Sequence, residues 1–155
     1  MKSRTTAALI IAAIVCLCAL TASAQTKPDF SGAWKMNKEK SKFANVAPDA
    51  ILIKIDHKEP VLTEEWSLST PDGAFSFQAK YTIGGQETEQ EVMGRMAKTS
   101  AKWEGDALVI EFKEEGRPFK RKITLSADGK IMTKVITHSE GGGDLVEDTV
   151  VFEKQ

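Results

Sequence analysis

The feature that most constrains this chain is a two-residue alternation of apolar and polar side chains along most of its length. In the clearest stretch, residues 75–83, one face carries aromatic and aliphatic side chains, and the other carries serine, glutamine, lysine and threonine. The same alternation runs through residues 51–56, 108–113 and 119–125. A period of two is typical of a β-strand with one buried face. After residue 25, no segment shows the 3.6-residue period of an amphipathic helix.

Turn-forming residues separate these segments at almost even spacing. They are glycines, often beside aspartate or proline, at residues 71–73, 84–85, 105–106, 116, 128–129 and 141–144. Such residues suit hairpin reversals because they tolerate the backbone angles that tight turns require. The pattern predicts ten strands, at residues 30–37, 50–57, 61–69, 74–83, 86–93, 96–104, 107–114, 117–126, 130–139 and 144–153.

The predicted strands must bury a shared apolar face. Consecutive strands joined by short hairpins are neighbours in a sheet, which makes the chain an up-and-down meander. A meander of this length rolls up to cover its apolar face and to remove its free edges. We therefore predict an all-β fold, an antiparallel up-and-down β-barrel of about ten strands. Because this barrel is wider than an eight-strand one, we expect interior space that side chains do not fill.

The first 24 residues differ in character from the rest of the chain. Two basic residues precede an apolar run at residues 7–20, which ends in the small residues Ala-Ser-Ala. This layout is typical of a secretory signal peptide, cleaved here after Ala24. The run is too short for a membrane span, which needs about 20 apolar residues. We expect a signal peptide at 1–24, one barrel domain at 25–155, and a periplasmic or secreted protein without a membrane span.

Charge and cysteine usage narrow the classes of function. The chain has 155 residues, with 21 basic and 22 acidic side chains and a net charge of -1. This balance argues against nucleic-acid binding, which depends on a basic surface. Both cysteines lie in the first 24 residues, so the barrel domain has no thiolate for a disulfide, a metal or a nucleophile.

Candidate catalytic and metal-binding groups are sparse. The histidines of the barrel domain, His57 and His138, match no zinc pattern. No nucleophile motif such as Gly-x-Ser-x-Gly is present. Adjacent carboxylates such as Glu64 and Glu65 point to opposite faces of a strand and cannot share a substrate. We therefore expect no metal, no cofactor and no enzymatic activity.

The barrel domain opens with a short motif. Phe30, Gly32 and Trp34 form Phe-x-Gly-x-Trp on the first predicted strand, and Lys-Ser-Lys-Phe follows at residues 40–43. Together with the ten-strand pattern, this motif resembles the calycin superfamily and is most similar to small secreted bacterial lipocalin-like proteins. Gly32 permits a sharp bend and close backbone approach. The resemblance implies that Trp34 closes one end of the barrel against a basic residue of the last strand, for which Lys154 is the candidate.

The chain also departs from fatty-acid-binding proteins, which belong to the same superfamily. Those proteins carry a helix-turn-helix lid between the first two strands, whereas polar residues 38–49 fill that place here. They also hold the ligand carboxylate with an Arg-x-Tyr pair in the last strand, where this chain has Val150 and Phe152. The resemblance therefore implies an apolar or weakly polar ligand rather than a fatty acid, or no ligand.

Aromatic side chains on the alternating segments are the candidate cavity lining, and they serve equally well as packed core: Trp66, Phe75, Phe77, Tyr81, Trp103 and Phe112. Arg121 lies on an apolar strand face. If that face points inward, Arg121 needs an acidic partner, either Asp148, Glu64 or a ligand acid. The alternative, which the sequence favours, is that Arg121 lies near a barrel mouth and its charge reaches water. We include Arg121 and Asp148 in the predicted ligand site.

Taken together, these features predict a secreted, monomeric lipocalin-like barrel that binds a small hydrophobic, lipid-like molecule in its interior. The alternative is a filled barrel that acts as an envelope structural or protein-interaction module with no internal ligand. A third hypothesis, an enzyme on this scaffold, requires polar groups that converge inside the barrel.

Overall fold

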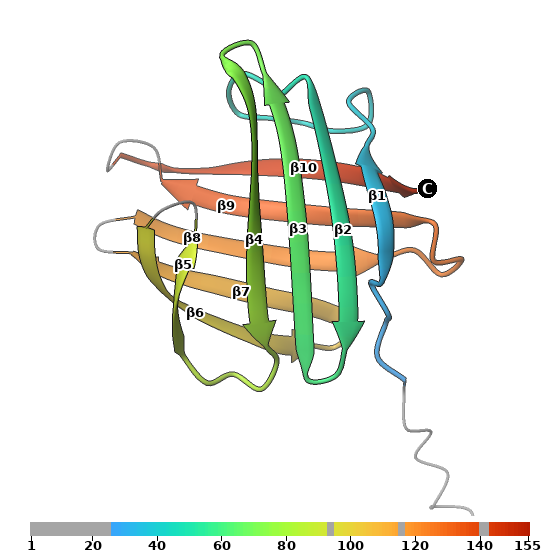
Figure 1. The fold of residues 1–155 in the computed structure, drawn as a ribbon, viewed down its shortest axis with the longest axis vertical. Coiled ribbons are helices and arrows are strands. Elements are labelled where there is room, and N and C mark those ends of the chain that lie inside the picture. Colours follow the sequence, from blue (N-terminus) through green and yellow to red (C-terminus); the bar gives the residue numbers. More distant parts are fainter. Residues whose placement is uncertain (1–25, 93–94, 115–116, 140–142) are drawn as a thin grey trace, which may run out of the picture.

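A computed structural model describes residues 26–92, 95–114, 117–139 and 143–155 (Figure 1). The predicted signal peptide at residues 1–24 lies outside the described residues, as do the predicted turn residues 116, 141 and 142. Over the described ranges, no helix is long and apolar enough to cross a membrane.

The fold consists of ten antiparallel strands, and each bound lies within two residues of its prediction. The strands are β1 (Gly32–Met36), β2 (Ala50–Lys58), β3 (Val61–Thr70), β4 (Gly73–Thr82), β5 (Thr88–Val92), β6 (Arg95–Glu104), β7 (Ala107–Glu114), β8 (Arg117–Leu125), β9 (Ile131–Ser139) and β10 (Leu145–Lys154). The alternation of side chains and the turn residues therefore predicted the secondary structure correctly, because most of the strands bury one face.

The strands form one sheet in the order β4-β3-β2-β1-β10-β9-β8-β7-β6-β5. Strands that are neighbours in sequence pair with each other except β4 and β5, and the pairing of β1 with β10 joins the two halves of the chain. Figure 1 shows β1–β4 crossing over β6–β10 at a steep angle, so that the sheet folds back on itself. The predicted up-and-down barrel is confirmed in this respect.

Closure of the barrel is incomplete between β4 and β5. Within the described residues, no backbone ladder joins these two strands. They approach each other at one end, where Ile83 forms a parallel bridge with Ala101 of β6 and the Gly84 amide donates to the Ala101 carbonyl. The link at residues 83–87 is longer than a tight hairpin, so it does not set β5 directly beside β4. The barrel is therefore nearly closed rather than continuous.

The predicted motif residues lie together at one end of the core. Phe30 and Trp34 are fully buried, and Trp34 Nε1 donates to the Phe30 carbonyl at 2.9 Å. Lys154 faces Trp34 across the β1–β10 ladder, and its Nζ lies 5.3 Å from the centre of the indole ring. Gly32 has a φ of 131° and borders the Lys154 side chain, so a side chain at position 32 would collide with it.

Candidate ligand site in the barrel

A pocket of about 240 Å³ lies inside the barrel, below the segment that joins β1 to β2. Its wall is apolar apart from Arg121 and Asp148, and consists of Phe43, Val46, Pro48, Ile51, Trp66, Leu68, Phe77, Ile136, Val150 and Phe152. Ligand pockets in proteins typically measure about 300 to 1,000 Å³. This pocket therefore suits a small molecule or one end of a longer one.

Three charged side chains from three strands meet beside this pocket, and of these Arg121 lines its wall. Glu64 of β3 is fully buried, and one of its oxygens accepts a hydrogen bond from Arg121 Nη1 of β8 at 2.8 Å. Its other oxygen accepts from Lys134 Nζ of β9 at 2.5 Å. Trp66 Nε1 also donates to the Glu64 carboxylate, at 2.9 Å. We call Glu64, Arg121 and Lys134 the ion cluster.

The ion cluster carries one positive charge in excess when all its members are ionised. Burial by itself raises the pKa of Glu64, but the charges of Lys134 and Arg121 outweigh burial and hold this pKa below its ordinary value. For Lys134, burial dominates over the attraction of Glu64 and lowers its pKa to about 8. At neutral pH this side of the pocket is therefore cationic and favours a negatively charged or hydrogen-bond-accepting group.

Arg121 is only 5% exposed, so the interpretation that its charge reaches water is wrong. Its partner is Glu64 rather than Asp148, because β8 and β3 face each other across the interior. The guanidinium also packs against the rings of Trp66, Phe112 and Phe119, at 4.8, 5.6 and 5.5 Å from their centres.

Two buried polar atoms beside the ion cluster have no hydrogen bond of ordinary geometry among the described residues. They are Arg121 Nε and the Tyr81 hydroxyl oxygen. Burial raises the pKa of Tyr81, so its hydroxyl remains a neutral donor. The Tyr81 and Arg121 side chains interact with each other, and this interaction helps to raise the pKa of Arg121.

Among the predicted aromatic residues, four lie near the ion cluster. Trp66 and Phe77 stack at 5.6 Å and line the pocket. Tyr81 and Phe112 meet edge to face at 5.9 Å, and Phe112 covers one side of Arg121. The structure therefore brings these four side chains together with Arg121, although only Trp66 and Phe77 line the pocket wall.

Trp103 lies in a different cluster, against Phe30 and His57 beyond the β2–β3 turn. Its Nε1 donates to Glu59 at 2.8 Å, and it does not line the pocket. It is therefore a packing residue of another part of the barrel. Alternation along a strand tells which face a side chain lies on, but not its position along the strand. The position of Trp103 on β6 puts it beside Phe30 and His57 rather than in the pocket wall.

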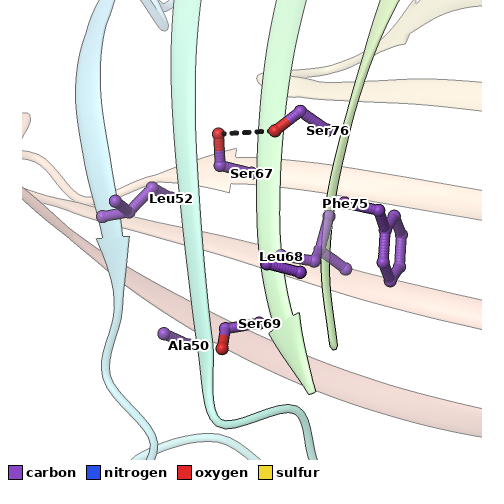
Figure 2. Close-up of a pocket in the computed structure, with 8 residues that line it drawn as sticks. Ala50, Leu52, Ser67, Leu68, Ser69, Phe75 and Ser76 are labelled. Carbon is purple, nitrogen blue, oxygen red and sulfur yellow. Dashed lines mark hydrogen bonds between the residues drawn. The ribbon is translucent and has the colours of Figure 1, made fainter. Parts of the chain in front are cut away.

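Phe75 lies at the rim, where 42% of its surface is exposed. It borders a second hollow of about 310 Å³ along the ends of β2, β3 and β4 (Figure 2). Small uncharged residues dominate this hollow, and the hydroxyls of Ser67 and Ser76 form a 3.2 Å hydrogen bond across β3 and β4. No charged side chain lines it, so nothing there would orient a polar ligand.

Asp148 fixes the segment that covers the pocket. We call this segment, residues 37–49, the strap, and Figure 1 shows it at the same end of the barrel as the β3–β4 turn. Asp148 accepts a hydrogen bond from the Ala44 amide at 2.7 Å and contacts His138 Nε2 at 3.2 Å. Lys42 and Thr149 exchange two backbone hydrogen bonds beside it. The strap thus occupies the place that the resemblance assigns to a helical lid.

Lys134 is the member of the ion cluster that the sequence analysis missed. It lies between Met132 and Ile136 on one face of β9, and Met132 is fully buried. That spacing is the signal that would have pointed to it. The signal is ambiguous, because Ile131 and Val135 make the opposite face of the strand apolar as well.

Comparisons with known proteins identify the fold. No family model and no curated protein matches the chain. Solved structures that resemble it include a point mutant of the fluorescent protein UnaG, with a TM-score of 0.61 and 17% identity over 81% of this chain and 96% of that one. A point mutant of the REP1-NXSQ fatty acid transporter has a TM-score of 0.61 and 17% identity, covering 82% and 98% of the two chains.

Zebrafish ileal bile acid-binding protein, crystallised with cholic acid, has a TM-score of 0.59 and 18% identity, covering 81% and 98%. At these identities the likeness shows the fold alone, which is a calycin-like barrel of the kind found in fatty-acid-binding proteins. Two of these neighbours are described as transport or binding proteins.

Proposed function

We propose that this protein binds a small, largely hydrophobic molecule whose polar or acidic end approaches Arg121. The observation that carries the proposal is the apolar pocket with the buried Arg121 guanidinium in its wall. The fatty acid transporter and the bile acid-binding protein among the structural neighbours support the same class of ligand.

The last strand supports this proposal in an unexpected way. Val150 and Phe152 occupy the positions of the Arg-x-Tyr pair and form part of the apolar wall. The positive charge comes instead from β8 and β9, where Arg121 and Lys134 outnumber Glu64. The chain therefore lacks the last-strand pair that holds the ligand carboxylate in fatty-acid-binding proteins. A ligand with an acidic end remains compatible with the pocket, because Arg121 and Lys134 supply positive charge from other strands.

Storage, transport or sensing of the ligand is proposed rather than catalysis. The carboxylate beside the pocket, Glu64, accepts hydrogen bonds from three donors and has a lowered pKa, so it is a poor general base. Over the described ranges, no group of three or more His, Cys, Asp and Glu side chains could hold a metal ion.

We also propose that the protein acts outside the cytoplasm, in the periplasm or beyond the cell. The basis is the N-terminal segment of residues 1–24, with its basic start, apolar run and Ala-Ser-Ala ending. Expression of the full chain in a bacterial host tests this point. Intact-mass measurement of the exported protein is expected to show a chain that begins at Gln25, and a cytoplasmic chain of full mass would contradict it.

Native mass spectrometry before and after delipidation tests ligand binding directly. A discrete adduct that disappears on delipidation is expected, and its mass gives the class of the ligand. Uptake of a fluorescent fatty acid and of its methyl ester is then compared in the Arg121→Met variant. We expect the variant to lose at least tenfold in affinity for the acid and much less for the ester, because only the acid gains from the positive charge.

Two tryptophan substitutions on β9 provide a matched control. Ile136→Trp fills the pocket, whereas Val135→Trp places the same large side chain on the opposite face of the strand. Probe binding should be lost in the first variant and kept in the second. A bare mass in both native spectra, together with no probe uptake by the unmodified protein, would instead favour the filled barrel that acts through its surface.

A further inference from the structure

The open side of β4 presents unpaired backbone groups. In an antiparallel ladder, alternate residues direct their N–H and C=O groups to one neighbouring strand and the others to the opposite side. The backbone N–H of Lys80 donates to the Gln90 side chain of β5, so the backbone groups of Lys80 point away from β3. Ala74, Ser76 and Gln78 are separated from Lys80 by even numbers of residues, so their backbone N–H and C=O groups also point away from β3. No backbone group of the described residues pairs with them on that side.

This edge lacks the features that usually protect a free strand. Natural edge strands carry charged side chains, proline or bulges that prevent another strand from pairing with them. Residues 73–79 contain neither a charge nor a proline, and the ladder between β3 and β4 runs without a bulge from Thr70–Gly73 to Val61–Thr82. Every residue from Gly73 to Ser76 is exposed. The edge is therefore a template for an added strand.

We propose that a second copy of this chain occupies the edge, so that the two β4 strands pair antiparallel about a two-fold axis at Ser76. In this register Asp72, the turn residue directly before β4, reaches the level of Lys80 of the partner at both ends of the pairing. Phe75 lies opposite Phe77, also twice by symmetry. Opposite charges and aromatic pairs directly across two strands each stabilise a sheet. The edge is thus complementary to itself in charge, side-chain type and hydrogen bonding.

The alternation of the ladder selects this register over its neighbours. With the axis at Ser76, Ala74, Ser76 and Gln78 all form hydrogen-bonded pairs, giving about six backbone hydrogen bonds between the copies. With the axis at Phe77, Ala74 would face Lys80, whose amide already donates to Gln90, and Asp72 would face Thr82. With the axis at Phe75, Asp72 would face Gln78. Both shifts lose the pairs between opposite charges.

The proposed pairing uses edge backbone groups that the ligand site does not use, although it shares Phe77 with the pocket wall, and it replaces the monomer that the sequence predicts. Ser76→Pro tests it, because proline removes the central edge N–H while the β3 ladder uses the alternate residues. Ser76→Thr is the matched control, since it keeps both the N–H and a hydroxyl. Sedimentation at graded concentrations should show a dimer for the unmodified chain and for Ser76→Thr, and a monomer for Ser76→Pro with unchanged circular dichroism.

Cysteine cross-linking tests the register itself in a chain that carries Cys16→Ser and Cys18→Ser. Facing residues of a hydrogen-bonded pair lie about 5.5 Å apart between Cα atoms, within the range of a disulfide. Ser76→Cys should cross-link to itself under mild oxidation. Ala74→Cys should not, because its two copies lie several residues apart, but it should cross-link when mixed with Gln78→Cys.

Three results would overturn the proposal. The first is a monomer at all concentrations without cross-linking of Ser76→Cys, which would leave the edge to a strand of another protein. The second is a Ser76→Pro chain that remains as dimeric as the unmodified protein, which would place the interface elsewhere. The third is self-cross-linking of Ala74→Cys at the rate of Ser76→Cys, which would indicate random encounters.

Discussion

At the scale of single residues, Glu64 determines the charge arrangement inside the barrel. Its carboxylate is fully buried and connects β3 to β8 and β9 through Arg121 and Lys134. A buried charge is tolerated only when it is paired and hydrogen-bonded. Glu64 therefore neutralises one of the two cations and holds the Arg121 side chain in the pocket wall.

Removing the negative charge of Glu64 is expected to destabilise the fold strongly. Glu64→Gln leaves two buried cations close together, and loss of one partner from a buried ion pair costs about 3 to 5 kcal/mol. The matched control is Glu65→Gln, on the exposed face of the same strand, for which we expect a change below about 0.5 kcal/mol. Urea unfolding followed by tryptophan fluorescence measures both. Equal effects of the two substitutions would contradict the role given to Glu64.

Lys134 should make the stability of the protein depend on alkaline pH. Its pKa is about 8 in the folded chain, below the ordinary value of 10.5. Between these two values the unfolded chain holds a proton that the folded chain has lost, so the free energy of unfolding rises with pH. Above pH 10.5 Lys134 is neutral in both states. The free energy of unfolding should then be higher by roughly 3 kcal/mol than it is below pH 8, as a result of this one group.

The measurement compares the unmodified protein with Lys134→Met, from pH 7 to pH 10.5. Their difference in unfolding free energy should shift in favour of the unmodified protein as pH rises, because the variant lacks the titrating group. A difference that stays constant over this range would show that Lys134 keeps its ordinary pKa.

At the scale of elements, the strap is the segment whose attachment controls access to the pocket. It lies along β10 through the Lys42–Thr149 bridge and the bond from the Ala44 amide to Asp148. Phe43, Val46 and Pro48 of the strap line the pocket. Because the strap has few backbone hydrogen bonds compared with a strand, local opening there requires less free energy than opening of the sheet.

Loss of the Asp148 contact is expected to accelerate exchange of ligand. In Asp148→Ala the Ala44 amide loses its acceptor, so the strap opens more often and a bound fluorescent probe should associate and dissociate several-fold faster. Glu147→Ala, on the exposed face of β10, is the control and should leave both rates unchanged. Stopped-flow fluorescence gives the rates. Unaltered rates in Asp148→Ala would mean that the ligand reaches the pocket by another route.

The bend at the start of β1 depends on glycine. In Gly32→Ala a Cβ would lie 2.8 Å from Lys154 Cε, at a φ of 131° that side chains rarely adopt. Gly129→Ala has a φ of 69° but open space around it, so it reports backbone strain alone. We expect Gly129→Ala to cost about 1 kcal/mol and Gly32→Ala about 2 to 3 kcal/mol. Thermal unfolding compares them, and equal costs would contradict a larger backbone strain at Gly32, because Lys154 Cε lies near the end of a flexible side chain and can move away from the new Cβ.

At the scale of the whole molecule, the sheet is rolled up by the pairing of its first and last strands. Trp34 lies opposite Lys154 in this ladder, and the pocket beneath the strap lies inside the rolled sheet. The free edge between β4 and β5 is where the molecule departs from a closed barrel. Ligand binding and pairing of copies are therefore assigned to different parts of one sheet.

A ligand that occupies the pocket is expected to stabilise the entire barrel, since the pocket exists only in the folded chain. At a free concentration one hundred times its dissociation constant, a ligand adds about 2.7 kcal/mol to the free energy of unfolding. The fluorescent fatty acid should therefore raise the unfolding temperature of the unmodified protein and of Val135→Trp. It should leave Ile136→Trp unaffected, and an equal shift in all three would indicate binding outside the pocket.

The candidate site could be predicted only in part. Alternation put Trp66, Phe77 and Arg121 on apolar strand faces, but it did not settle that Arg121 is buried and gave no position along the barrel axis, so Trp103 and Phe75 were grouped with them. Lys134 was missed because its strand is apolar on both faces. A charged side chain inside a barrel is stable only if a partner of opposite charge lies across the interior. Here Glu64 is that partner, and it is 57 residues from Arg121 and 70 residues from Lys134 along the chain.

By itself, the sequence determined the ten strands, their order and the burial of one face, because alternation and turn residues act through neighbours along the chain. Tertiary structure alone decided that Glu64 meets Arg121 and Lys134, that the pocket lies beneath the strap, and that β4 keeps a free edge. These features arise from contacts across the rolled sheet, where distances depend on how the strands coil and close rather than on any local pattern.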